Sequence, residues 1–196
     1  MCLVWKTAAD EKSRKENLDT EWKLNIDILA QALDIIGIKP EVDMFASRIN
    51  AQFPRYASFR PDPAAEAVDS FSISWFGFLF YAFPPFCVIP SMLQKLCRDK
   101  ASGVVVHPDW PNQPWYAAVA RMLVKRPVLV SARNYLLCLP QLPEEKHWLV
   151  KLRLIICEIS GADSESQDFR TQLFQLCAPH GALGLRRCAS YIQICV

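Results

Sequence analysis

Glycine is scarce in this chain, with six residues against fourteen prolines. The six glycines are scattered and form neither a Walker loop nor a G-x-G-x-x-G fingerprint, so the sequence offers no glycine-rich loop to cradle a phosphate. Many prolines with few glycines indicate many connections between short secondary-structure elements.

Metal-ligating and nucleophilic motifs are also lacking. The chain has three histidines and eight cysteines, but no C-x-x-C pair, so we expect no zinc site. No local signature places a base beside a nucleophile, which argues against a Ser-His-Asp or Cys-His enzyme. The first residues contain no apolar segment long enough for a signal peptide. We therefore expect reduced thiols in an intracellular protein of the cytoplasm or nucleus.

Charged residues are absent from Ser70 to Leu93, which is long enough to suggest a membrane span. Against a span, Pro84, Pro85 and Pro90 would remove backbone donors, and no Lys or Arg cluster flanks the stretch. A buried strand of an α/β sheet explains the run from Phe78 to Phe86 better, because such strands are apolar on both faces. We predict no membrane contact and a strand that presents Pro84, Pro85 and Phe86 at the mouth of a site.

The remaining periodicities predict a strand and helix series. A helix should begin at Asp19 or Thr20 and end at Gly37, and a short strand should follow that ends near Asp43. Further helices are expected over 89–100 and 115–123, and strands over 104–106 and 127–130. The sequence therefore predicts an α/β fold with a partly parallel, doubly wound sheet. Beyond it we expect a linker at 140–145, a helix from Trp148 to Ile159, another around Phe169, and an unpatterned tail from 178.

Two acidic residues are candidates for chemistry. Asp43 would lie at the carboxyl end of a strand, where ligand crevices form, although an Asp capping the turn at Ser47 explains it equally well. Asp109 and His107 occupy a loop rich in polar and aromatic groups and could serve in acid-base work. A hydrogen-bonded loop residue is the ordinary alternative for His107.

Arginines alternate with aromatic residues between Ser47 and Trp75. Arg48, Arg55 and Arg60, together with Tyr56, have the composition of a single-stranded nucleic-acid surface, in which cations bind phosphate and rings stack on bases. The ordinary alternative is a solvated loop. A net charge of +2 adds no support, because the cations are dispersed.

Three long motifs in one order resemble the polyprotein of DIRS-like, tyrosine-recombinase retrotransposons: Pro40 to Tyr56, Phe80 to Phe86 and Val104 to Tyr116. The resemblance covers roughly residues 8 to 175 and lies between reverse transcriptase-ribonuclease H and the recombinase. It implies that Asp10 is a metal-binding carboxylate at the end of the ribonuclease H domain. The partner carboxylates would lie upstream of this chain, so we expect no metal site.

The middle of this segment is similar to phage-type N6-adenine methyltransferases, whose signature is Asn or Asp, then Pro-Pro, then an aromatic residue. The polar residue and a proline carbonyl accept from the adenine amino group, and the ring stacks on a flipped base. In this chain Phe83 occupies the polar position and cannot accept a hydrogen bond, which costs on the order of 1 to 3 kcal/mol of recognition.

The resemblance implies four segments: a ribonuclease H remnant at 1–18, a Rossmann-like methyltransferase-type domain at 19–140, a helical linker at 141–177 and an unstructured tail at 178–196. The expected role is non-catalytic and without a cofactor, either nucleic-acid association or spacing within the retroelement polyprotein. One alternative is an active S-adenosylmethionine-dependent adenine methyltransferase that uses Asp43, Asp109 and Phe86. Another is an interaction module with no nucleic-acid role.

Overall fold

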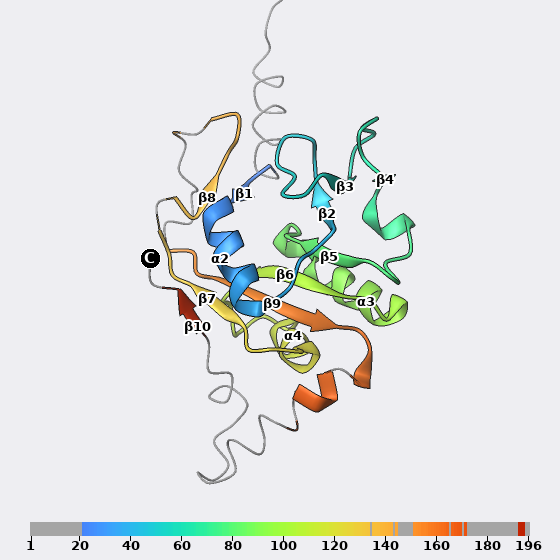
Figure 1. The fold of residues 1–196 in the computed structure, drawn as a ribbon, viewed down its shortest axis with the longest axis vertical. Helices are drawn as coiled ribbons and strands as arrows, with labels where there is room; N and C mark the ends of the chain where they lie inside the picture. The colour runs from blue at the N-terminus through green and yellow to red at the C-terminus, as the bar shows by residue number, and fades with distance from the viewer. Residues whose placement is uncertain are drawn as a thin grey trace, which may run out of the picture.

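An eight-stranded sheet forms the centre of the molecule (Figure 1), in a computed structural model that describes residues 21–133, 135–142, 144, 151–164, 166–169, 171 and 192–194. The strand order is β10-β7-β9-β6-β5-β2-β3-β4. The strands are β2 (Val42–Ala46), β3 (Arg55–Ser58), β4 (Ala67–Val68), β5 (Leu79–Ala82), β6 (Ser102–Pro108), β7 (Val128–Val130), β9 (Leu154–Ser160) and β10 (Ile192–Ile194).

The sheet is mostly parallel. Strands β4, β3, β2, β5 and β6 pair in parallel, β9 is antiparallel to both β6 and β7, and β10 is parallel to β7. The chain moves outward from β2 through β3 to β4, then returns to β5 and continues the other way. The predicted α/β class is therefore confirmed, and the winding direction reverses between β2 and β5.

Helices cover both faces of the sheet. Helix α2 (Ile26–Ile36) packs on one face, and α3 (Ile89–Asp99) and α4 (Tyr116–Met122) pack on the other. Alternate residues of β6 show the division, because Val104 and Val106 lie in the core under α2 while Val105 lies in the core under α3 and α4. Coverage of both faces explains why Val104 to Val106 are all apolar and do not alternate with polar residues.

A short antiparallel ribbon, β1 (Lys23–Leu24) with β8 (Leu137–Cys138), lies beside the main sheet. It leads directly into α2, whose N-cap is Asn25 rather than the predicted Asp19 or Thr20. The Asn25 Oδ1 atom accepts from the backbone N–H groups of Asp27 at 2.9 Å and Ile28 at 3.3 Å. The predicted C-cap is confirmed, since Gly37 is left-handed with φ 73°.

Replacing Asn25 by Ala should lower the free energy of unfolding by about 1 kcal/mol, because two N–H groups of the first turn lose their acceptor. Urea unfolding monitored by circular dichroism measures the change. Asn25→Ser is the matched control, since a hydroxyl can also cap the helix, and it should recover most of the loss. An equal loss in both variants would contradict the capping role.

The apolar stretch from 70 to 93 contains the predicted strand as β5, followed by the turn η2 (Phe86–Val88) and the first residues of α3. It is thus divided between a central strand and an amphipathic helix. Within the part of the chain that the structure describes, no helix has the length and apolarity needed to cross a membrane.

The helix predicted from Trp148 to Ile159 is wrong where the structure describes it. Residues 154–160 form β9, a central strand, rather than part of a helical linker. Apolar residues at Leu152, Ile155 and Ile159 fit helical spacing, but Cys157 packs in the same core as Ile155 and Ile159, which is the period of a strand. Residues 192–194, predicted as tail, form β10, and Phe169 lies in a helical turn.

Candidate functional site

A small pocket lies where the winding of the sheet reverses. Strands β2 and β5 are neighbours there, with Val42 paired to Phe80 and Asp43 to Tyr81. In open α/β sheets, ligands bind outside the carboxyl ends of the two strands at this point. Its cavity volume is about 10 Å³, far below the roughly 300 to 1,000 Å³ of small-molecule sites. It is lined by Trp22, Lys23, Leu24, Asp43, Phe45, Asn50, Gln52, Tyr81 and Phe83.

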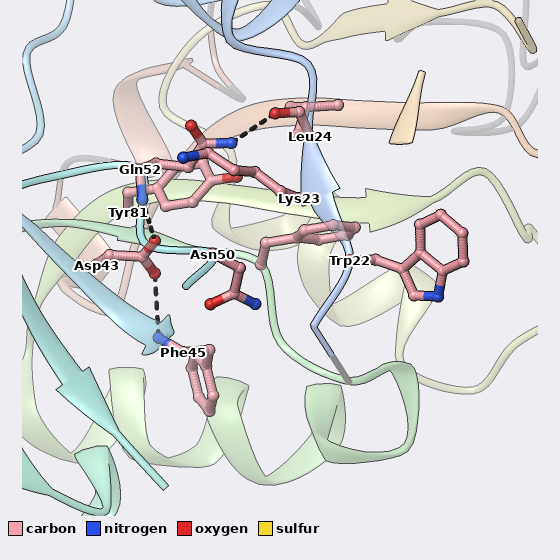
Figure 2. Close-up of a pocket in the computed structure, with 9 residues that line it drawn as sticks. Trp22, Lys23, Leu24, Asp43, Phe45, Asn50, Gln52 and Tyr81 are labelled. Carbon is pink, nitrogen blue, oxygen red and sulfur yellow. Dashed lines mark hydrogen bonds between the residues drawn. The ribbon is translucent and has the colours of Figure 1, made fainter. Parts of the chain in front are cut away.

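Asp43 is the buried carboxyl group of this pocket, with 2% of its surface exposed. Its Oδ1 accepts from the Phe45 N–H at 3.2 Å and its Oδ2 from the Gln52 N–H at 3.1 Å (Figure 2). Burial raises its pKa to about 7, against the opposing effects of these two hydrogen bonds and of Lys23. The carboxyl group therefore exchanges a proton near neutral pH.

Asp43 does not cap the turn at Ser47, contrary to the alternative interpretation of this residue. The Ser47 N–H donates to Asn50 Oδ1 at 2.7 Å, so Asn50 closes the turn. Asp43 instead fixes the far end of the same loop through Gln52. Asp43 is the second residue of β2, and its strand continues to Ala46, beyond the predicted end.

Two buried polar atoms in the pocket have no hydrogen-bond partner among the described residues: Tyr81 Oη and Gln52 Oε1. Burial raises the pKa of Tyr81 well above its usual value, and the charge of Asp43 adds to the effect. Neither residue is among the candidates predicted from the sequence. Tyr81 sits in an apolar strand, and only its hydroxyl within the run Phe78 to Phe86 could have drawn attention to it.

The β1 segment covers the pocket. The Gln52 Nε2 atom donates to the Leu24 carbonyl at 2.6 Å, and Lys23 Nζ donates to the Ala51 carbonyl at 2.8 Å. Figure 2 shows β1 beside the cluster of Asp43, Gln52 and Tyr81, with the Lys23 side chain extending toward this cluster and Trp22 on the other side of the strand. The chain thus fills with its own backbone part of the space in which a ligand would lie.

The Pro-Pro-aromatic segment follows β5 directly. Pro84 is buried, Pro85 is exposed, and Phe86 is half-buried. The Phe86 ring packs edge-to-face on Trp110, with ring centroids 5.1 Å apart, and against Phe83 at 6.3 Å. Contrary to the prediction for Pro84, only Pro85 and Phe86 reach the surface, and Phe86 already has an aromatic partner.

Asp109 and His107 have structural partners outside the pocket. Asp109 accepts from Tyr116 Oη at 2.9 Å and forms an ion pair with Arg153 at 2.6 Å. His107 lies in β6 rather than in the predicted loop, and its ring nitrogen Nδ1 lies 2.9 Å from the Pro108 carbonyl, to which it can donate. Burial lowers the pKa of His107 to about 4, so the imidazole is neutral at neutral pH.

The predicted nucleic-acid residues divide into two groups. Arg55 forms two hydrogen bonds to Glu66, at 2.5 and 3.1 Å, and a third to Glu41 at 3.4 Å. Tyr56 is buried, and its hydroxyl donates to Asp62 at 2.9 Å, so its ring is not presented to a base. Arg48 and Arg60 are exposed. Asp10 lies outside the described residues.

The residues that the structure describes contain no group of three or more His, Cys, Asp or Glu side chains that could hold a metal ion. The four cysteines located there, Cys87, Cys97, Cys138 and Cys157, are free thiols.

Comparison of the chain with family models, with curated proteins and with solved structures gives no match.

Proposed function

We propose that the chain carries a non-catalytic, methyltransferase-like domain of a retroelement polyprotein, with a role in nucleic-acid association or in spacing reverse transcriptase-ribonuclease H from the recombinase. The strand order supports the Rossmann-like part. Numbered in chain order from β2, with the ribbon and β10 left out, the sheet reads 3-2-1-4-5-7-6 with strand 7 antiparallel. The first five positions match a dinucleotide-binding sheet.

The non-catalytic assignment depends on one side chain, Phe83, which follows β5 directly. The resemblance places the adenine-recognising polar group at Phe83, beside the crevice. A phenyl ring there offers no acceptor to an exocyclic amine, and it packs instead against Phe86. A missing polar contact in a closed site removes discrimination as well as affinity.

The residues present do not fit S-adenosylmethionine. Residues 47–54, between β2 and β3, contain turns and bends but no helix, so the loop after β2 provides no helix N-terminus to the crevice. The crevice is also small and crossed by β1, which two side-chain hydrogen bonds hold in place. A cofactor of that size would have to displace Lys23 and Leu24 together with their pairing to β8.

Titration calorimetry with S-adenosylmethionine tests this assignment. We expect no binding heat at about 1 mM ligand, which excludes interactions stronger than about −4 kcal/mol. A cooperative melt of the same sample provides the control that the protein is folded. A dissociation constant well below about 1 mM would contradict the proposal.

The second candidate is a working adenine methyltransferase, and one observation favours it: Asp43 lines the crevice with a pKa near neutral pH. Asp109, its other proposed acid-base residue, is held by Arg153 and Tyr116. Transfer of a labelled methyl group to adenine in DNA, lost in Asp43→Asn and in Phe86→Ala, would establish this alternative.

A further inference from the structure

Exposed apolar side chains gather at the carboxyl ends of three neighbouring strands. Phe59 follows β3 and is 86% exposed, Val68 ends β4 and is 47% exposed, and Ile49 follows β2 and is 38% exposed. These strands are parallel, so the three positions share one edge of the sheet. Figure 1 shows the loops after β2 and β3 together at that end of the molecule.

Asp62 joins the loops that carry these residues. Its carboxylate accepts from the Ala64 N–H at 3.0 Å, from Tyr56 Oη at 2.9 Å and from the backbone N–H of Arg48. These hydrogen bonds, the one from Ala64 first, lower the pKa of Asp62, and the nearby charge of Arg48 adds to the effect. The turn containing Arg48 is therefore fixed against the loop that begins with Phe59 and Arg60. Because its oxygens accept from these internal donors, Asp62 organises the surface rather than offering it an open acceptor.

This surface combines one exposed ring, Phe59, with two exposed arginines, Arg48 and Arg60, on the loops that follow β2 and β3. Phe59 has no aromatic neighbour within the described ring contacts, whereas the ring of Tyr56 is buried and the guanidinium of Arg55 is bound to Glu66. A flat ring that stacks on a base, with cations at the phosphates on either side, is the arrangement that binds single strands without sequence preference. Duplex bases present no free face to such a ring.

We propose that Phe59, Arg48 and Arg60 form a binding surface for single-stranded nucleic acid, with Phe59 as the stacking residue. The proposal rests on the nucleic-acid role in the proposed function. It keeps Arg48 and Arg60 from the sequence prediction and replaces Arg55 and Tyr56 by Phe59. It is independent of whether the domain has lost catalysis, which calorimetry with the cofactor decides separately.

Fluorescence anisotropy of a labelled oligothymidine of about ten nucleotides, titrated with the full chain at low salt, tests the surface. Phe59→Ala should weaken binding by about 5- to 100-fold, and Phe59→Trp should retain it. Arg48→Ala should reduce the slope of log affinity against log salt by about 0.7. Phe76→Ala is the matched control: its ring is 71% exposed but precedes β5 at the opposite edge, so binding should be unchanged.

Three outcomes would overturn the proposal. The first is no binding by the wild-type chain at low salt, and the second is equal binding by wild type and Phe59→Ala. The third is a dimer in sedimentation that dissociates on Phe59→Ala, which would assign the surface to a second copy of the chain. Unchanged melting of Phe59→Ala, expected for a side chain that is 86% exposed, excludes unfolding as the cause of a loss.

Discussion

Replacing Asp43 by Asn should remove a loss of stability that the protein undergoes between about pH 4 and pH 7. The carboxyl pKa is 3.8 when unfolded and about 7 when folded. Between these values the native state holds a proton that the unfolded state has released, so raising the pH favours unfolding. The contribution is constant below the lower value and fully lost above the upper one. Its total is roughly 4 kcal/mol for a fully buried group.

The measurement is the difference in unfolding free energy between Asp43→Asn and wild type, obtained by urea titration at pH 4 and pH 8. We expect this difference to shift in favour of the variant by roughly 4 kcal/mol from the lower to the higher pH. Asn can accept only one of the two hydrogen bonds made by Asp43, but that loss is a constant offset at both pH values. Asp34→Asn, on the exposed side of α2, is the control.

The wild-type curve alone would not reveal the effect, because His107 acts in the opposite direction. Its pKa falls from 6.5 to about 4 on folding, so the unfolded state binds the extra proton and stability rises with pH in this window. The two buried groups partly cancel. A variant difference that stays flat across the range would show that Asp43 is ionised, and paired or hydrated, throughout.

Gly161→Ala should destabilise the protein severely, because the added methyl group meets the backbone of a packed helix. A Cβ at this position would overlap the carbonyl oxygen of Leu96 and lie 3.0 Å from the Cα of Cys97, near the end of α3. These are backbone atoms, and the Gly161 N–H is fixed to the Ala101 carbonyl at 2.8 Å. We expect a loss of at least about 3 kcal/mol in unfolding free energy.

Gly37→Ala separates this steric clash from ordinary backbone strain. Gly37 has φ 73° but no atom within 4 Å of a Cβ, so Ala there should cost only about 1 kcal/mol. Chemical unfolding of both variants gives the comparison. Equal losses would mean that the contact between Gly161 and α3 adjusts without cost.

Local signals in the sequence determined several elements. Three signals can be recognised from nearby residues alone: the apolar run Phe78 to Phe86, the apolar stripe of α3 and the glycine at the end of α2. The structure contains them as β5, α3 and the Gly37 cap. The position of Asp43 near a crevice could also be predicted from the sequence, because a strand followed by a loop implies a position at the edge of an α/β sheet.

Tertiary structure decided the rest, because burial and pairing join residues far apart in the chain. Leu154–Ser160 becomes a strand through pairing with β6 and β7, which outweighs its apparent helical spacing. Arg55 is ion-paired to Glu66 at the surface, Tyr56 is buried with its hydroxyl on Asp62, and Phe59 is left exposed. The sequence by itself set which segments could be strands and helices, whereas packing determined which side chains remained exposed.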